Sequence, residues 1–328
     1  MDRTATRPAA RFVPATWAAL AVVTAVIAAV LAGALRNTTL PALIGTGITR
    51  AGTDVAGIAC VGLALVGVLV PIAGRATADT GEVDRVRMLV DRSLVALGGT
   101  WLVLALSGIA VRAADAYDRP VTTLTLPDVL AWLTGLAAGR GALLTVACAA
   151  AVLGCGIGRL RNPDAVALRI VLVIGLLGML TPGVTGHASS SASHEVAVTT
   201  VALHVAAASL WVGGLGAILV LLGRRRALLL GVLPRFSTLA AFCLFTVTVS
   251  GVLTAQVRLG SWAALFFTGY GALVIAKAVA LVGLGGLGLL TRRRMAAGRM
   301  PVLRWAAVEV TLMAVTLGLA AALSQTAP

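Results

Sequence analysis

The stretch TGHASSSASHEVAVTTVALHVAAASLWVGGLGAILVLL, residues 185–222, joins a Ser-rich connection to a long apolar run. A helix needs about 20 consecutive apolar residues to cross the hydrocarbon core of a bilayer. Residues 195–222 meet this length, and the basic triplet Arg224, Arg225 and Arg226 follows them. The stretch therefore predicts a transmembrane helix whose basic end lies in the cytoplasm.

The composition of the whole chain indicates the same class of protein. Its 328 residues are 59% hydrophobic and 12% charged, with a mean hydropathy of +1.01, whereas soluble domains are about 25% charged. We therefore expect an all-α, polytopic integral membrane bundle. The net charge of +14 would favour a nucleic-acid partner in a soluble protein. Here the arginines cluster between apolar runs, so we expect the lipid bilayer and no nucleic acid as partner.

Repeated apolar runs predict about nine transmembrane helices in a multi-pass protein of the plasma membrane. Most of the 26 Lys and Arg residues lie in the N-terminal tail or after the even-numbered runs. This bias places the N-terminus in the cytoplasm and the C-terminus outside. The predicted runs are residues 14–35, 54–73, 93–111, 140–158, 166–184, 195–222, 236–257, 269–290 and 302–323.

The runs fall into three parts: a cytoplasmic tail over residues 1–13, a four-span membrane region over 14–165 and a five-span domain over 166–328. The charged segment 74–92 is expected to be a cytoplasmic loop. Residues 128–136, DVLAWLTGL, are amphipathic and include Trp132. They predict a helix at the membrane interface rather than a further span.

Several classes of chemistry are not indicated. The four cysteines, Cys60, Cys148, Cys155 and Cys243, lie in apolar runs without a CxxC motif, so we expect neither disulfides nor a thiolate zinc site. The chain also lacks a nucleotide-binding Walker motif and an HExxH motif. We therefore do not expect ATP-driven transport or enzymatic activity.

Three ionisable residues fall inside predicted spans: His204, Lys277 and Glu309. A Lys or acid at the bilayer centre costs about 2.5 to 3.5 kcal/mol on insertion scales, so each should face the bundle interior or water. His204 and Lys277 lie at similar depths from the outer face and are expected to be neighbours. Two accounts of Lys277 and Glu309 stay open: an interhelical ion pair, or part of a polar track for a cation. His204 could likewise serve only as a hydrogen-bonding residue between helices.

A metal site is suggested near the outer face. His187 and His194 lie on the Ser-rich connection, and Met179 lies about two turns into the preceding run. Imidazole and thioether ligands together suit copper. His194 and His204 are ten residues apart, about 15 Å along a helix, so one ion cannot bind both. We therefore expect a relay from His187 and His194 towards His204, with Met179 or Met313 nearby. The alternative is that the two outer histidines are ordinary solvated residues.

One motif in this region resembles a known family. HVAAASLWVGGLGAILVL, with His204, Trp211 and the pair Gly213 and Gly214, resembles the copper resistance protein D (CopD) family, as do RFSTLA at 235–240 and Lys277. GHASS at 186–190 is similar to an outer-face GHA element of that family. Upstream, residues 47–70 and the GRGALL segment at 139–144 resemble the N-terminal half of actinobacterial members. The ending, residues 304–328, resembles the junction in actinobacterial CopD and cytochrome c oxidase assembly fusions, whose second part does not follow here.

The resemblance implies an inner-membrane copper protein that moves copper towards the cytoplasm. It gives His187, His204, Trp211, Lys277 and Glu309 as the residues to test, with Trp211 beside the path or in the packing. A copper ion is the expected ligand, and an external copper chaperone or an oxidase assembly factor is a candidate partner. Two other functions remain open. One is a haem-binding membrane redox protein, which we do not expect because facing histidines within spans are lacking. The other is a non-catalytic scaffold for oxidase assembly.

Overall fold

The computed structural model describes residues 13–31, 40–77, 80–184, 194–259, 263–296 and 302–323, and all regular structure in them is helical. The helices are α1 Val13–Leu31, α2 Leu40–Thr77, α3 Thr80–Ala116, the short 3-10 helix η3 Val121–Thr123, α4 Leu126–Gly135, α5 Ala137–Arg161, α6 Leu168–Val184, α7 His194–Leu222, α8 Arg226–Leu259, α9 Ala264–Phe267, α10 Gly269–Ala296 and α11 Val302–Leu323.

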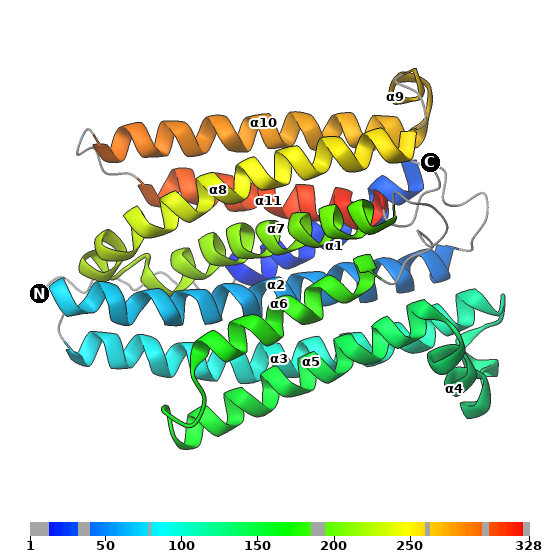
Figure 1. Ribbon diagram of the computed structural model, residues 1–328, viewed down its shortest axis with the longest axis horizontal. Coiled ribbons are helices and arrows are strands. Elements are labelled where there is room, and N and C mark those ends of the chain that lie inside the picture. The colour runs from blue at the N-terminus through cyan, green and yellow to red at the C-terminus, as the bar shows by residue number, and fades with distance from the viewer. Residues whose placement is uncertain are drawn as a thin grey trace, which may run out of the picture.

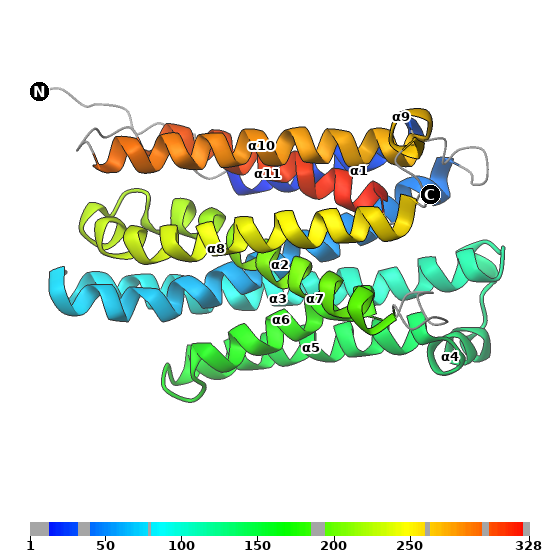
Figure 2. The same cartoon turned by 45° about the horizontal axis from the view of Figure 1, so that its top comes forward.

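The long helices lie side by side along one axis and alternate in direction (Figures 1 and 2). The α5–α6 and α7–α8 connections lie at one end of the bundle, on the left of Figure 1, while α4 and α9 lie at the other end. The arginines at 224–226 and 292–294 belong to the left-hand end. A membrane-spanning bundle with its basic loops on one side has this arrangement.

Within the described residues, seven helices are long and apolar enough to cross a membrane. These segments are Leu43–Ile72, Thr80–Ala116, Ala137–Arg161, Val198–Leu222, Arg226–Gln256, Gly271–Arg294 and Trp305–Ala322. Two shorter apolar segments, Ala15–Leu31 in α1 and Leu168–Thr181 in α6, correspond to the first and fifth predicted runs. The protein is thus a polytopic helical membrane protein, as predicted, and the count of nine spans stays a prediction.

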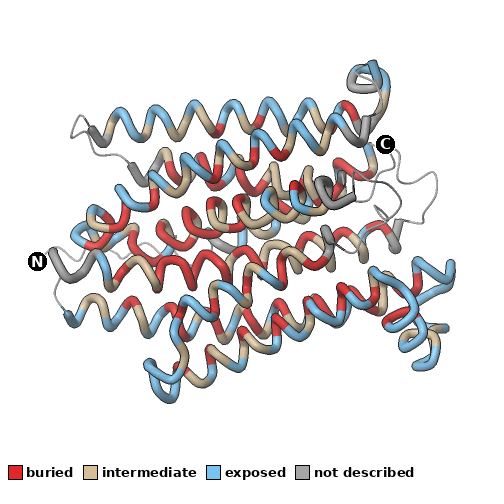
Figure 3. The backbone as a smooth tube through the Cα atoms, in the orientation of Figure 1, coloured by how far each residue is buried: buried red, intermediate tan, exposed pale blue. Residues whose placement is uncertain are grey.

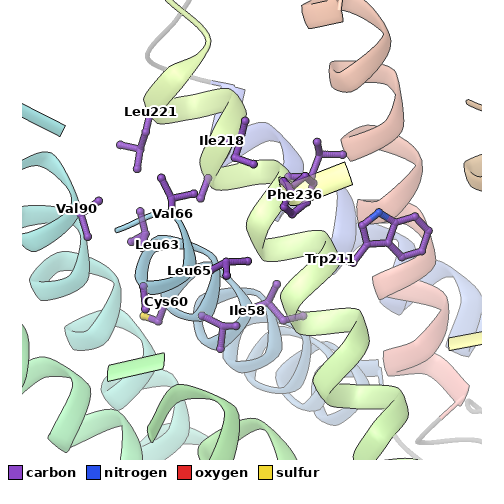
Figure 4. Close-up of a cluster of buried hydrophobic side chains, with 14 of the residues drawn as sticks. Ile58, Cys60, Leu63, Leu65, Val66, Val90, Trp211, Ile218, Leu221 and Phe236 are labelled. Atoms are coloured by element: carbon purple, nitrogen blue, oxygen red, sulfur yellow. The ribbon is translucent and has the colours of Figure 1, made fainter. Parts of the chain in front are cut away.

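The core forms where α2 packs against α7 with almost no side chain between them. A Cβ added to Gly62 would lie 2.0 Å from the carbonyl oxygen of Gly213, so the two backbones touch. Around this contact, Ile58 and Leu65 of α2 and Ile218 of α7 belong to one cluster of buried side chains (Figure 4). Figure 3 shows that burial concentrates in these inner helices, whereas α10 is largely exposed. Small residues allow this close approach in membranes, where packing rather than the hydrophobic effect holds helices together.

A buried ion pair fastens α3 to α5. Nε of Arg159 lies 2.7 Å from Oδ1 of Asp91, and both side chains are buried. The same guanidinium donates to the carbonyls of Pro163 and Val166 in the α5–α6 connection. Since removing one partner of a buried pair typically costs about 3 to 5 kcal/mol, this cluster fixes the relative positions of α3, α5 and α6.

The charged segment 74–92 differs from its prediction as a loop. Helix α2 continues to Thr77 and α3 already begins at Thr80. Asp84 and Arg87 face each other one turn apart, with 3.9 Å between their charged groups, on an exposed part of α3. Local charge pairs of this kind support a helix outside the bilayer. Apolar runs therefore marked the membrane-spanning parts, but the helices extend beyond them.

The helix predicted over residues 128–136 is confirmed as α4, Leu126–Gly135, and its place at the membrane interface stays a prediction. The Thr125 hydroxyl accepts from the Asp128 N–H, and the Thr125 backbone N–H donates to the Asp128 carboxylate, which together make a capping box. Trp132 is buried beneath the guanidinium of Arg112, whose Cζ lies 5.9 Å from the centroid of the Trp132 ring. The helix therefore packs back onto the end of α3.

Candidate functional site

His204 of α7 is held by a hydroxyl group of the neighbouring helix α8. Its Nδ1 lies 2.9 Å from Oγ of Ser250, and Ser250 is 4% exposed. The Ser250 hydroxyl donates its own hydrogen to the Thr246 carbonyl one turn back. Its oxygen is therefore left to accept, so Nδ1 carries the imidazole hydrogen. The other ring nitrogen, Nε2, is then a hydrogen-bond acceptor.

Lys277 of α10 lies beside this acceptor nitrogen. Its Nζ is 3.5 Å from Nε2 of His204. Position 251 of α8, next to Ser250, is a glycine, and a Cβ there would stand 3.7 Å from Cε1 of His204. Three helices, α7, α8 and α10, thus converge on one half-buried imidazole. The prediction that His204 and Lys277 are neighbours is confirmed.

Glu309 of α11 does not join this group. Its side chain is 6% exposed, and among the described residues it forms no hydrogen bond or ion pair. A Cβ added to Gly288 of α10 would lie 3.8 Å from Oε1 of Glu309. Gly288 follows Lys277 by eleven residues, about 16 Å along the helix. The ion pair between Lys277 and Glu309, one of the two accounts left open above, is therefore not formed.

The two methionines lie in different interfaces. Met313 of α11 is fully buried and, at one turn beyond Glu309, shares its helix face. Met179 of α6 is buried against α2 and α3, because its Sδ is 2.3 Å from where a Cβ of Gly57 would stand and Trp101 packs at the same point. The structure therefore places Met179 among the helices of the N-terminal half and does not bring it to His204.

Of the two outer histidines, His187 lies outside the described residues. His194 is the first residue of α7, and its side chain is also outside the description. Helix α7 continues without a break from His194 through His204. The separation of about 15 Å between these two residues therefore holds. Metal capture by His187 and His194 stays a prediction.

Trp211 belongs to the packing around the α2–α7 contact. It is 5% exposed and lies on the side of α7 that faces away from Ile58 and Leu65 (Figure 4). It follows His204 by seven residues, which is two turns on nearly the same face. The structure is thus compatible with both expectations for it, a wall beside a path and ordinary packing.

All four cysteines are free thiols. Within the described residues, no group of three His, Cys, Asp or Glu side chains stands close enough to hold a metal ion. Any metal bound in this part of the protein must therefore use fewer such ligands, or add methionine or backbone groups. A transported ion needs weaker ligation than a resident one, since it must leave again.

Sequence reasoning missed Ser250 and Thr291. Ser250 stands in the run FTVTVSGVL of α8, where hydroxyl residues are frequent and usually bond to their own backbone. Its position before a glycine at the depth of His204 was the signal that could have found it. Thr291 stands just before the basic triplet at 292–294, so the sequence indicates only that it lies at the end of a membrane span. In the structure its Oγ is buried without a hydrogen-bond partner among the described residues.

Comparison with known proteins assigns part of this chain. Residues 230–323, from α8 to the end of α11, match the family model described as Copper resistance protein D. This part of the chain is therefore similar to the CopD family. The match contains Ser250, Lys277 and Glu309, whereas His204 precedes it. The match lies inside residues 166–328, the predicted five-span domain.

A curated relative is the copper transport protein CutJ of Bacillus subtilis (strain 168). It is 31% identical over 138 residues, which cover 39% of this chain and 25% of the relative. The aligned part thus spans about a quarter of that relative's length. No solved structure matches the chain.

Proposed function

We propose that this protein moves copper ions across the plasma membrane and that His204 binds the ion within the bundle. The observation that carries the proposal is the fixed orientation of the imidazole: Nδ1 donates to Ser250, and the lone pair of Nε2 points to the interior position beside Lys277. Metal-binding histidines commonly have their second nitrogen hydrogen-bonded in this way, which orients the ring and strengthens the ligand. The CopD match over residues 230–323 and the likeness to a copper transport protein support copper as the ion.

Lys277 gives this site a second state. In the structure its ammonium group lies where an ion bound to Nε2 would stand. A copper ion and a protonated amine repel each other, so copper binding requires Lys277 to turn away or lose its proton. When the ion leaves, the ammonium group of Lys277 returns to Nε2 and replaces the positive charge of the ion. Lys277 thereby keeps the affinity low enough for release.

Met313 extends the route towards the cytoplasm. Its thioether is a soft ligand suited to copper, and it lies on the face of α11 that carries Glu309 one turn further down. Met179 packs against Gly57 in another interface, so the proposed route from His204 uses Met313. The outer steps, capture at His187 and His194, remain part of the proposal. So do the nine spans, the cytoplasmic N-terminus and the external C-terminus. No covalent reaction is required of any residue.

The test is copper accumulation in cells that express the wild type, His204→Ala or Ser209→Ala at matched membrane levels. Ser209 is the control because it is buried on the same helix and its hydroxyl has no hydrogen-bond partner among the described residues. The wild type and Ser209→Ala should raise cell copper above the empty vector, and His204→Ala should not. Equal copper in all strains would refute transport.

The same purified proteins separate the two other functions. A haem protein would show a visible absorbance band that His204→Ala abolishes. A scaffold for oxidase assembly would co-purify with a partner and would not need His204. A copper chaperone that delivers the ion from outside would co-purify with both the wild type and the variant.

A further inference from the structure

The cytoplasmic halves of α10 and α11 enclose polar groups that the copper site does not use. Their register follows from three contacts: Gly283 faces Leu312, Gly288 faces Glu309, and the Arg294 guanidinium lies 4.6 Å from the centroid of the Trp305 ring. The helices are antiparallel, so Thr291 lies opposite the turn between Trp305 and Glu309. Gly288, Thr291 and Arg294 are spaced by three residues and share the face that meets α11.

Two side chains in this interface lack partners. The Glu309 carboxyl group is 6% exposed and forms no hydrogen bond or ion pair among the described residues. The buried Oγ of Thr291 is likewise unpaired there. Other threonines, such as Thr254 of α8 and Thr316 of α11, donate to a carbonyl in the preceding turn. Thr291 is thus a free hydroxyl on the helix face that meets α11.

Among the described residues, no charged group pairs with Glu309; the side chain of Arg304 on α11 lies outside the description. Helix α1 has no ionisable residue over 13–31, and the ionisable residues of α7, which are His194, Glu195 and His204, lie in its first half. Helix α2 carries Arg50 and Asp54, which pair with each other, and Arg75 near its far end. On α10, Lys277 is beside His204 and Arg294 stacks on Trp305. Arg292 and Arg293 are exposed. Among the described residues no ion pair reaches the carboxyl group.

An ionised carboxylate without a partner is strongly disfavoured in a dry interior. Glu309 therefore has to hold a proton or face another cation. Gly288 contributes here, because a larger residue would fill the space beside Oε1. The interface thus offers the carboxyl group of Glu309 and the hydroxyl group of Thr291, with Met313 one turn further along α11. A monovalent cation fits this set.

We propose that Glu309 and Thr291 form a cation site that holds a proton at rest and exchanges it for a passing copper(I) ion. In the exchange the O–H bond of Glu309 breaks, the proton passes to water at the cytoplasmic ends of α10 and α11, and the ion takes its place beside the carboxylate. No electron moves, and one positive charge replaces another. The copper half of this exchange rests on the proposed function, whereas the proton half does not.

Infrared difference spectroscopy on the purified protein tests the proton half directly. At neutral pH the wild type should show a protonated-carboxyl band that Glu309→Gln lacks and the control Thr316→Val keeps. Thr316 is the control because it lies on α11 and its hydroxyl is bonded within its own helix. If the spectrum of Glu309→Gln equals that of the wild type, Glu309 is ionised and the site is wrong, whatever the protein transports.

Added copper(I) tests the exchange. The wild-type band should fall as copper is titrated, and Thr291→Val should require about tenfold more copper for the same loss, a typical effect of removing a supporting group at a metal site. A band that copper leaves unchanged contradicts the exchange. In proteoliposomes with a pH-sensitive dye, the wild type should release one proton for each copper ion that enters, and Glu309→Gln should move copper without protons. One result would separate the two proposals. If the protonated-carboxyl band of the wild type is present and falls with added copper, but the protein moves no copper, then the proposed transport is wrong and the cation site at Glu309 and Thr291 is still supported.

Discussion

At the scale of single residues, the decisive feature is an imidazole whose two nitrogens have different tasks. Ser250 fixes the tautomer of His204 through Nδ1, which leaves Nε2 as the nitrogen that would bind the proposed ion. Lys277 competes for the same nitrogen. Three different helices therefore supply the proposed ligand, the group that orients it and the charge that opposes the ion. Small relative movements of those helices would change the affinity of the site.

Ser250→Ala should weaken copper binding at His204 without unfolding the protein. Removal of the hydroxyl frees the ring to turn and to place its hydrogen on either nitrogen, and such changes typically cost about 10- to 100-fold in metal affinity. Competition with a copper(I) chelator measures the affinity. Thr254→Val is the matched control, since the Thr254 hydroxyl bonds only to the Ser250 carbonyl. Equal affinities for all three proteins would mean that His204 does not bind the ion.

Lys277→Met should act in the opposite direction on affinity. Methionine retains much of the length of the side chain but removes the charge that opposes a cation at Nε2. We expect tighter copper binding, by roughly tenfold for each 1.4 kcal/mol of repulsion removed, together with slower release. Chelator competition and the rate of copper efflux from loaded proteoliposomes check the two effects. Weaker binding in this variant would show that Lys277 supports the ion rather than opposing it.

At the scale of helices, the bundle depends on positions where backbones touch. A Cβ added to Gly213 of α7 would lie 2.2 Å from the Ile58 carbonyl oxygen of α2, whereas one added to Gly216 would meet nothing within 4 Å. Gly213→Ala should therefore lower the thermal unfolding midpoint in detergent, at a cost of about 1 to 3 kcal/mol or more for overpacking. Gly216→Ala should leave it unchanged or raise it, because Ala favours a helix over Gly. Equal midpoints would contradict the backbone contact.

Helix α4 should be sensitive to acid. The Thr125 hydroxyl and backbone N–H donate to Asp128, and with Arg119 nearby they hold the pKa of Asp128 below its ordinary value of 3.8. Because the folded pKa is lowered, this contribution is present above pH 3.8 and is lost as the pH falls through the folded pKa. Hydrogen exchange of residues 126–135, corrected for intrinsic rates, should accelerate in that window. Asp128→Asn should remove this acid sensitivity. If it stays as acid-sensitive as the wild type, the capping box is not the cause.

The sequence predicted helices best where an apolar run ends in charge. The run at 195–222 became α7, His194–Leu222, and the run at 302–323 became α11 with the same ends. The segment 74–92 was wrongly predicted to be a loop. Hydropathy identifies the part of a helix that lies in the membrane, and it does not indicate whether the helix continues into water. Depth counting was enough to pair His204 with Lys277. It could not pair Met179 with Gly57 or detect Ser250, because both depend on how the helices are rotated and packed.

At the scale of the whole molecule, the described polar groups of α7, α10 and α11 lie in sequence through the bundle. His204 and Lys277 lie in the outer half, Met313 and Glu309 follow on α11, and Arg294 on Trp305 lies nearest the basic end. The N-terminal half is instead fastened by the Asp91–Arg159 pair and the α2–α7 contact. We expect it to serve as the frame against which α8, α10 and α11 move.

The proposed order of polar groups, from His204 to Arg294, requires one orientation of the bundle in the membrane. Introduced single cysteines can test this orientation. Thr122 is exposed at the α4 end of the bundle, and Asp164 is exposed in the α5–α6 connection at the other end. The native cysteines are buried or half-buried and should react slowly. Because the arginines gather at the Asp164 end, that end should face the cytoplasm. A membrane-impermeant thiol reagent should label Thr122→Cys but not Asp164→Cys in intact cells, and the reverse in inside-out vesicles. The opposite result would invert the bundle, place Glu309 towards the outside and reverse the direction in which copper passes from His204 to the proton site.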